Sequence, residues 1–467
     1  MTDVDVIVLG SGFAGLRAAV AASSSGCSVL VVEAQPEIGG RSRFSWSNIM
    51  GAGTRFQREA GIDDSARAMF DQYMRLNAFR LDASVAWALC EGAGREIEWL
   101  ADNGVEIRGI VPNESFEVPR IHRTRGGQQI IDVLTKLARA QGVDFALNHR
   151  VDRLLVEDGR VVGIEADGEQ LRAKAIVYAT AGMVGNKELV NIWMPELAKL
   201  AGDWVLPVGG DELAPYAQGD AIPLAESVGA QITGRDYYEA TIRPGYVQVS
   251  NPALPGHLIM IDATGRRFVD ETAGIAAMHG AFNSAVAPVY AIFDEAAKND
   301  YNPSGIRSEE GTPKRRLHPD WVEDVVDAMV EQGEIVKATS LNEMADTLGI
   351  ARENLASTIA KYNADVEAGF DSVQLKDSSV LRTVEAGPFY ATEIRLSSIG
   401  FTGAGPRVNA FGEVLNTRHE VIAGLFAGGE CAGGLAGPMS IGGNPTATCF
   451  AFGRIAGDSA AAYAAEN

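Results

Sequence analysis

The chain begins with two apolar runs that flank a glycine-rich turn and an alanine-rich segment. Residues 3–9 are rich in β-branched apolar side chains, which is typical of a buried strand. Residues 16–25 have the composition of a helix, and residues 28–32 form a second apolar run that ends at Glu33. The pattern predicts a strand–helix–strand unit whose first turn is the segment Gly10-Ser-Gly-Phe-Ala-Gly15.

The spacing of this segment is typical of a dinucleotide site. Gly10 permits the tight turn, Gly12 lets the backbone approach a pyrophosphate, and Gly15 lets the helix lie close to the strand. The helix would then present free N–H groups and its positive dipole end to the phosphates. Glu33, at the end of the second run, can accept hydrogen bonds from both ribose hydroxyls.

A second glycine pair narrows the choice of dinucleotide. Gly39-Gly40 follows Glu33 closely and leads into Arg41-Ser42. Such a pair lets the chain pass beneath the flavin side of a pyrophosphate, which NAD sites do not need. The sequence therefore favours FAD.

Further along the chain the hydrophobic pattern predicts several more elements. These are mainly helical structure over residues 63–104, a helix over 130–141, a hairpin over 151–164 with its turn at 157–160, a buried strand over 175–179, a surface loop over 303–318, two helices over 341–368 joined near Gly349, and an alanine-rich helix from Thr446. Between about residues 210 and 401, tyrosine, proline and charged residues increase, which indicates a change of domain.

Composition and charge exclude other classes. The 467 residues are 46% hydrophobic and 22% charged, as in a globular protein with a large core. The net charge of −21 disfavours nucleic acid as a partner. The cysteines Cys27, Cys90, Cys431 and Cys449 show neither zinc-site spacing nor a disulfide framework, so no metal is expected. With no basic leader and no apolar run of about 18 residues, the expectation is a cytoplasmic protein without a membrane span.

Taken together and in order, the motifs resemble those of FAD-dependent oxidoreductases of the fumarate reductase, urocanate reductase and 3-ketosteroid dehydrogenase group. The resemblance covers nearly the whole chain. The segments that carry it are the glycine turn at 10–15, Gly51-Ala-Gly-Thr-Arg-Phe-Gln57, Ala179-Thr-Ala-Gly182, Gly219-Asp220, Gly265-Arg-Arg-Phe-Val-Asp-Glu271, Gly387-Pro-Phe-Tyr-Ala391, the glycine-rich run at 424–434, Ser440-Ile-Gly-Gly-Asn444 and Phe452-Gly-Arg-Ile-Ala-Gly457.

The resemblance implies an α/β fold with a discontinuous, Rossmann-like FAD-binding domain and an inserted α+β capping domain. The expected boundaries are 1–232 and 402–467 for the FAD-binding domain and 233–401 for the cap, with the active site between the cap and the flavin. The residues expected to bind FAD are Gly10, Gly12, Phe13, Ala14, Gly15, Glu33, Ala34, Gly39, Gly40, Arg41, Ser42, Ser47, Asn48, Val151, Ala179, Thr180, Gly182, Asp220, Gly429, Glu430, Gly443, Asn444 and Thr446. Of these, Glu430 would hold the ribityl region, and Gly443-Asn444 would open a helix aimed at the flavin N1–C2=O edge.

The chain departs from the resembling enzymes where they hold and protonate their substrates. Fumarate reductases of the group place an arginine proton donor where this chain has Ile275. They bind the carboxylates with an arginine at the position of Ser440, a histidine near Gly400 and an arginine near Leu254. The ketosteroid Δ1-dehydrogenases have tyrosines at positions 275 and 440. Without these cations a dicarboxylate would keep unpaired charge in a site of low dielectric, at a cost of several kcal/mol. An uncharged ketone or enone is therefore favoured.

The proton-transfer group must then come from other residues. Tyr238 is the first candidate because a phenol can donate to or accept from a substrate atom, and His279, Tyr390 and Ser440 are the others. Ser398 can donate to a carbonyl oxygen, and Arg243 can bind an anion. For each of them an ordinary packing or surface role is an equally simple interpretation.

Two alternatives stay open. One is a tricarballylate-type dehydrogenase that binds a polycarboxylate through Arg41, Arg43, Arg125 or Arg243. The other is a flavoprotein subunit without catalysis of its own. In every case the expected partners are a small-molecule substrate and an unidentified electron acceptor or donor.

Overall fold

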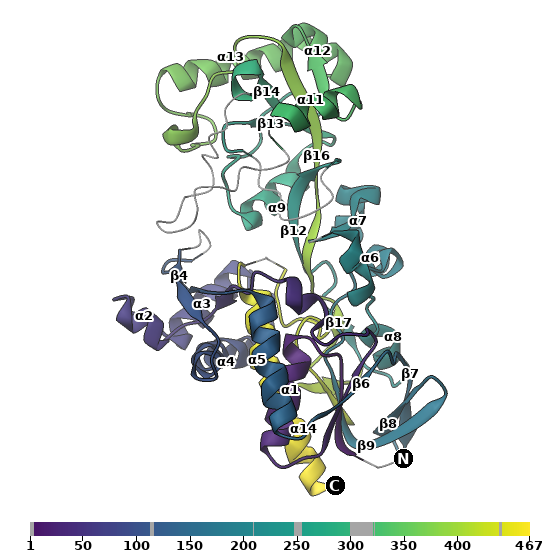
Figure 1. Cartoon of the computed structure of the whole chain (residues 1–467). Helices are drawn as coiled ribbons and strands as arrows, with labels where there is room; N and C mark the ends of the chain where they lie inside the picture. The colour runs from purple at the N-terminus through teal and green to yellow at the C-terminus, as the bar shows by residue number, and fades with distance from the viewer. Residues whose placement is uncertain are drawn as a thin grey trace. The chain divides into compact units, whose positions relative to one another are not determined.

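The computed structural model describes residues 4–112, 116–208, 210–246, 255–298, 321, 323–438 and 441–467. They group into two compact units, whose elements are labelled in Figure 1. The first unit comprises Met1–Glu196, Glu212–Glu239 and Gly400–Asn467. The second unit comprises Leu197–Asp211 and Ala240–Ile399.

These units differ from the expected domain boundaries in three segments. Residues 197–211, expected in the FAD-binding domain, belong to the second unit, and residues 233–239 and 400–401, expected in the cap, belong to the first. The reason for the first difference is a strand pairing between distant segments. Leu206 and Pro207 pair with Ser398 and Ile399, and composition gives no signal for such a pairing.

The first unit is built on a sheet to which both ends of the chain contribute. The parallel strands lie in the order β19-β9-β1-β2-β6, β18 lies antiparallel at one edge, and the hairpin β7-β8 joins through β9. The strands are β1 (Val4–Leu9), β2 (Val29–Glu33), β6 (Asp144–Leu147), β7 (Val151–Glu157), β8 (Arg160–Ala166), β9 (Glu169–Tyr178), β18 (Glu413–Leu415) and β19 (Val421–Ala427). Because β1 and β19 flank β9, the first and last thirds of the chain fold together.

Helices cover this sheet and complete its core. Their bounds are α1 (Phe13–Ser24), α2 (Arg55–Glu59), α3 (Ala66–Leu76), α4 (Ala83–Asp102), α5 (Gly127–Ala140), α6 (Lys187–Trp193), α8 (Ala221–Glu226) and α14 (Asn444–Glu466). In Figure 1, α1, α5 and α14 lie side by side, and they are in contact. Small sheets of β3 (Ile49–Met50), β5 (Ile121–Thr124) and β4 (Ile107–Val111), and of β11 (Ile232–Thr233) and β17 (Gly405–Pro406), complete the unit.

The second unit has its own sheet and core. Its sheet has the order β10-β16-β14-β13, with β12 and β15 also paired to β16. The elements are β10 (Leu206–Pro207), β12 (Tyr238–Pro244), β13 (Ile259–Ile261), β14 (Val289–Asp294), β15 (Val336–Ala338), β16 (Phe389–Thr402), α9 (Ile275–Ser284), α10 (Glu295–Lys298), α11 (Glu323–Glu331), α12 (Leu341–Leu348) and α13 (Arg352–Glu367). The first two residues of β12, the last three of β16 and the first two of α7 (Pro195–Ala201) belong to the first unit. Apolar side chains of α12 and α13, such as Met344 and Leu355, pack on Ile259 and Ile292 of the sheet.

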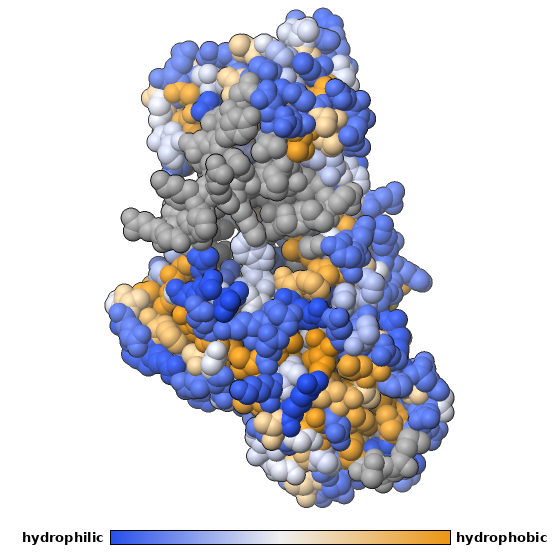
Figure 2. Space-filling model, in the orientation of Figure 1, coloured by the Kyte–Doolittle hydropathy of each residue, from blue (hydrophilic) through white to orange (hydrophobic). Residues whose placement is uncertain are grey.

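Most of the elements expected from the sequence are confirmed. The strand–helix–strand unit, the helices after residue 63, the 151–164 hairpin and the two helices joined at Gly349 are all present. The helix α1 begins at Phe13 rather than Leu16, and α14 begins at Asn444 rather than Thr446. The loop expected over 303–318 lies outside the described residues. Hydrophilic and hydrophobic residues alternate in patches on the visible surface (Figure 2). None of the described helices is long and apolar enough to cross a membrane.

Candidate cofactor site

The first turn of the sheet has the geometry that its glycines predict. Gly10 follows β1 with a φ of +97°, where a side chain would be strained and would clash with the Ala179 carbonyl oxygen. The helix α1 begins three residues later without a side-chain cap. The Phe13 N–H donates instead to Ser42 Oγ (3.1 Å), so the second glycine segment lies against the start of the helix. This arrangement leaves a helix N-terminus suited to an anion.

Glu33 is fixed by hydrogen bonds before any ligand is considered. The Ser11 N–H (2.9 Å) and Ser11 Oγ (2.6 Å) both donate to Glu33 Oε2, and the Gln35 N–H donates to Oε1 (2.9 Å). Ser11 Oγ also accepts from the Gly39 N–H (2.9 Å). Since a carboxylate oxygen has two lone pairs, Oε2 is saturated and Oε1 keeps one. Glu33 was expected to accept hydrogen bonds from both ribose hydroxyls. In this structure its carboxylate has one lone pair left, on Oε1, for a ribose hydroxyl.

The residues after Gly39 form the opposite wall. Arg41 Nη1 lies 3.7 Å from Glu430 Oε1, and Arg41 Nη2 donates to the Gly400 carbonyl oxygen (3.4 Å). Glu430 Oε1 accepts from the N–H and the hydroxyl of Thr402 (3.1 Å each). Gly182 permits this contact, because a side chain there would clash with Glu430 and Thr402.

These groups line one cleft in the first unit, with about 910 Å³ of space that protein atoms do not fill, part of it open to solvent. This lies within the usual range for small-molecule sites. The expected cofactor residues that line it are Gly10, Gly12, Phe13, Ala14, Glu33, Ala34, Gly40, Arg41, Ser42, Val151, Ala179, Thr180, Asp220 and Glu430. The others, which do not line the cleft, are Gly15, Gly39, Ser47, Asn48, Gly182, Gly429, Gly443, Asn444 and Thr446.

Sequence reasoning missed several residues of the cleft. They are Ser11, Gln35, His149, Arg150, Tyr216, Gln218 and Cys449, among others. His149 and Arg150 come just after β6, and the carboxyl ends of parallel strands are the common place for ligand contacts. Their position after this strand could therefore have identified them from the sequence. Arg150 makes a bidentate contact with Asp220 (2.8 Å), which ties two walls of the cleft together.

The cleft fits FAD on chemical grounds. It combines a helix N-terminus, an acceptor carboxylate at Glu33 and a cation at Arg41. The buried Arg41 Nη1 and Thr180 Oγ1 have no hydrogen-bond partner among the described residues, so both can still bind a ligand oxygen. A dinucleotide pyrophosphate with its sugar hydroxyls offers groups of that kind. Within the described part of the chain, no cluster of His, Cys, Asp or Glu is arranged to hold a metal ion.

The candidate catalytic residues fall in different places. Tyr238, the first residue of β12, belongs to the first unit and is 2% exposed. Burial and the charges of Glu196 and Asp236 raise its pKa above the usual value. His279 is a partly exposed residue of α9 in the second unit. Ser440 lies outside the described residues.

Tyr390, another of the proton-transfer candidates, lies in the core of the second unit. Its ring stacks on Phe293 with centroids 5.1 Å apart, and its hydroxyl donates to Glu295. It is fully buried, and these contacts agree with a packing role for this tyrosine. Ser398 is also buried, on the same strand, and its hydroxyl has no partner among the described residues.

Arg243 differs from the solvated arginine that its type suggests. It is 4% exposed, and its Nη2 donates to the Trp204 carbonyl oxygen (2.5 Å). Its guanidinium lies 5.6 Å from the centroid of the Trp204 ring, and burial lowers its pKa. The guanidinium group of Arg243 is therefore bound to Trp204 within the second unit.

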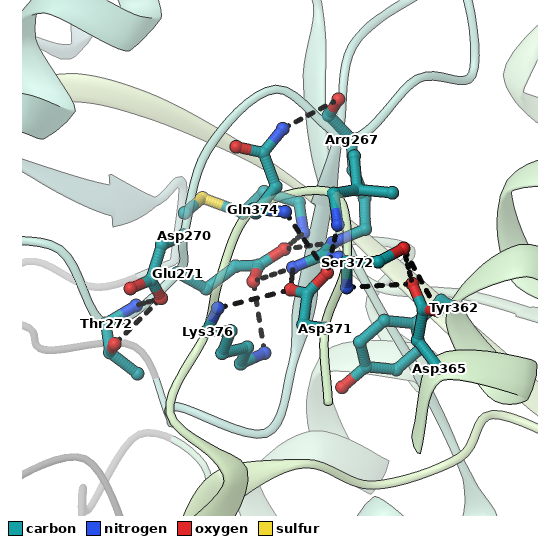
Figure 3. Close-up of polar contacts among 12 residues, drawn as sticks. Arg267, Asp270, Glu271, Thr272, Tyr362, Asp365, Asp371, Ser372, Gln374 and Lys376 are labelled. Atoms are coloured by element: carbon teal, nitrogen blue, oxygen red, sulfur yellow. Dashed lines mark hydrogen bonds and ion pairs between the residues drawn. The ribbon is translucent and has the colours of Figure 1, made fainter. Parts of the chain in front are cut away.

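Glu271 of the Arg-Phe-Val-Asp-Glu segment lies in a buried ion cluster of the second unit (Figure 3). Arg267 Nη2 bridges Glu271 Oε2 (2.8 Å) and Asp371 Oδ2 (2.9 Å), and Lys376 Nζ lies 3.1 Å from Glu271 Oε2. Burial would raise the pKa of Glu271, but Lys376, Arg267 and the Met260 N–H outweigh it, so that pKa is lowered. The cluster joins β13 to the 371–376 segment and makes Glu271 a structural anchor.

Comparison with known proteins agrees with the fold and the cleft. The family described as "FAD binding domain" matches residues 5–446. An NADH:fumarate oxidoreductase of Klebsiella pneumoniae is 30% identical over 98% of this chain and 47% of its own length. A vinyl phenol reductase of Lactiplantibacillus plantarum is 25% identical over 99% of this chain and 96% of its own. The structure of 3-ketosteroid-Δ4-(5α)-dehydrogenase from Rhodococcus jostii RHA1 with 4-androstene-3,17-dione is similar, with a TM-score of 0.77, 27% identity, and coverage of 98% and 97%.

The chain therefore belongs to the FAD-binding family of oxidoreductases that act on C=C and CH–CH bonds, and its cofactor is FAD. The α/β fold with an inserted second unit, expected from the resemblance, is confirmed. The chain spans about half the length of the Klebsiella relative and nearly the whole length of the Lactiplantibacillus one.

Proposed function

We propose that the chain moves a hydride between flavin N5 and a carbon of the C=C or CH–CH bond that lies next to the carbonyl of an uncharged, cyclic or steroid-like ketone or enone. The observation that carries this proposal is the chemistry at position 400 and its neighbours, the region in which the resembling fumarate reductases hold a carboxylate with a histidine. Here the residue is glycine, and a Cβ on it would lie 3.4 Å from the carboxyl carbon of Glu239. A carboxylate ligand there would meet the like charge of Glu239, while Arg41, the cation near the Gly400 carbonyl, already lies beside Glu430.

The remaining cations give a dicarboxylate little support. Arg243 is held by the Trp204 carbonyl, Arg41 lies beside Glu430 and Arg43 pairs with Glu37. Positions 254, 275 and 440 are Leu, Ile and Ser. The vinyl phenol in the name of one relative and the androstene dione bound in the similar steroid dehydrogenase belong to the less charged class that this chemistry favours.

Bound FAD supplies the hydride chemistry, and the chain must supply the proton. We assign that role to Tyr238. A phenol is protonated at neutral pH and burial raises the pKa of Tyr238 further, so the residue serves as a donor rather than as a base. A donor suits reduction of an enone, in which hydride reaches the β-carbon and a proton reaches the α-carbon.

The test uses reduced holoenzyme without oxygen, mixed separately with 4-androstene-3,17-dione, cyclohexenone, a vinyl phenol and fumarate. We expect an enone or vinyl phenol to reoxidise the flavin at about 1 per second or faster, and fumarate to leave it reduced. Rapid reoxidation by fumarate overturns the proposal. Reduction of the oxidised flavin by tricarballylate that is lost on removal of Arg243 or Arg125 would favour the polycarboxylate alternative. A reduced flavin that none of the compounds reoxidises would favour a non-catalytic subunit.

Tyr238→Phe tests the donor. It should keep FAD content and lower the reoxidation rate by roughly 10²–10⁴-fold. The matched control is Tyr237→Phe, because the hydroxyl of the neighbouring tyrosine donates to the Arg80 carbonyl oxygen (3.1 Å). The flavin reoxidation rate of this control should stay within about threefold of that of the parent protein. A loss of less than about threefold in Tyr238→Phe assigns the proton to another residue.

The proposal includes a redox partner. A fumarate reductase relative carries NADH in its name and is about twice as long as this chain. We propose that electrons reach the flavin of this chain from a separate carrier or domain. The net charge of −21 supports a partner with a basic docking face and disfavours nucleic acid.

A further inference from the structure

The start of α14 presents an unusual buried amide. The helix begins at Asn444 after Gly443, without a side-chain cap. Asn444 is 2% exposed, and its Oδ1 has no hydrogen-bond partner among the residues that the structure describes. A buried acceptor without a donor costs about 1–3 kcal/mol. Such an atom at a long helix N-terminus points to a ligand with a hydrogen to donate.

Tyr73 of α3 determines which end of this amide faces inward. The tyrosine is fully buried, and its hydroxyl lies 2.9 Å from Asn444 Nδ2 and 3.4 Å from the Leu435 carbonyl oxygen. The hydroxyl has one hydrogen, which it donates to the carbonyl, so toward the amide it can only accept. This requirement turns Nδ2 of Asn444 toward Tyr73 and leaves Oδ1 for another donor.

The α14 helix leads from this amide to the cofactor cleft. Cys449, five residues after Asn444, lines the cleft together with Glu430 and Gly428. Five residues of helix advance about 7.5 Å. FAD that fills the cleft and continues along α14 comes within reach of the helix start.

The group that matches this helix start is the pyrimidine edge of the flavin. That edge carries two carbonyl oxygens with the N3–H between them, the one N–H of the oxidised ring. A helix N-terminus offers donors and a positive dipole end to the carbonyls. Asn444 Oδ1 offers the acceptor that the N3–H needs.

We propose that Asn444 Oδ1 accepts a hydrogen bond from flavin N3–H, and that Tyr73 is the positioning residue that sets this orientation. Neither residue needs to touch substrate for this role. The inference goes beyond the proposed reaction, because it concerns the bound cofactor alone and is tested without substrate.

The experiment compares FAD with 3-methyl-FAD, which has a methyl group in place of the N3 hydrogen, by titration into the apoprotein. The parent should bind 3-methyl-FAD at least roughly tenfold more weakly than FAD, since Oδ1 loses its donor. The ratio of the Kd for 3-methyl-FAD to the Kd for FAD should fall to within about threefold of one in Asn444→Ala. In Tyr73→Phe it should fall by threefold or more, because the amide is no longer held in one orientation.

The control is Tyr463→Phe, at the other end of α14, whose hydroxyl accepts from Arg160 Nε (3.1 Å). Its ratio should equal that of the parent. If Tyr73 has only a structural role, Tyr73→Phe weakens FAD and 3-methyl-FAD equally, and the inference is wrong. A donor on the ribityl chain instead would leave the ratio independent of Asn444, which also overturns it.

A second measurement serves if 3-methyl-FAD does not bind. Alkaline titration of the bound flavin follows loss of the N3 proton by its absorbance. A hydrogen bond to a neutral carbonyl favours the protonated form. The apparent pKa of N3 should therefore be lower in Asn444→Ala and Tyr73→Phe than in the parent and Tyr463→Phe. Equal values in all four proteins contradict the inference.

Discussion

At the scale of single residues, hydrogen bonds fix Glu33 more firmly than its place at the end of β2 implies. Glu33→Gln should weaken FAD binding by roughly tenfold or more, because the carboxylate accepts charge-assisted hydrogen bonds that an amide replaces poorly. Glu37→Gln is the control, since Glu37 is an exposed carboxylate that pairs with Arg43 and does not line the cleft. Titration of apoprotein with FAD measures both. Equal losses would mean that Glu33 does not contact the ribose.

His122 gives the first unit a dependence on pH. The ring lies between Thr54 Oγ1 (2.7 Å from Nε2) and the Arg120 carbonyl oxygen (3.0 Å from Nδ1), and it is fully buried. Burial lowers its pKa from 6.5 to about 4. Between pH 6.5 and about 4, His122 is therefore protonated in the unfolded chain and neutral in the folded chain. The stability contributed by the neutral ring is present above pH 6.5 and falls as the pH drops toward 4.

We expect the unfolding free energy to fall by about 3 kcal/mol over this window from His122 alone. His122→Gln should remove that part of the slope. His149→Gln should keep it, because His149 is exposed beside Asp167. Urea unfolding at several pH values between 7 and 4 measures the three slopes. A slope unchanged by His122→Gln would show that the ring is protonated in the folded state.

At the scale of elements, the buried ion cluster makes a sharp prediction for the second unit. Lys376→Met leaves Glu271 with one cation fewer in a fully buried site and should cost about 3–5 kcal/mol. Lys361→Met is the matched control, since Lys361 pairs with Asp365 while half exposed and should cost less than about 1 kcal/mol. Adding Glu271→Gln to Lys376→Met should recover part of the loss. Urea unfolding compares them, and equal costs for the two lysines would contradict the account.

The elements that sequence could predict are those whose signal is local. The unit around Gly10 and the hairpin at 157–160 have their periodicity and turn residues within one segment. The strand β16 was missed because its polar residues break the alternation, and its pairing with β10, β14 and β15 is set by distant segments. The Tyr73–Asn444 contact spans 371 positions and has no motif at one of its ends. Cleft residues such as Arg150 likewise depend on how loops meet after folding.

At the scale of the whole molecule, the cofactor cleft is assembled from distant parts of one unit. Its lining comes from the segments 9–42, 149–151, 179–181, 215–224 and 428–449, all in the first unit. A ligand that binds only the folded form stabilises it by about 2.7 kcal/mol at a hundredfold excess over its Kd. That free energy should therefore protect the unit that makes the contacts.

Hydrogen exchange of apoprotein and FAD-loaded protein tests this expectation. FAD should slow exchange in β1, β9 and the first turns of α14, since their opening requires release of the cofactor. The helices α12 and α13 pack on the core of the second unit and should exchange at the same rate in both forms. Glu33→Gln should reduce the protection in the first unit at a fixed FAD concentration. Equal slowing of α12 and α13 would mean that both units open as one cooperative structure, and that cofactor binding stabilises the chain as a whole.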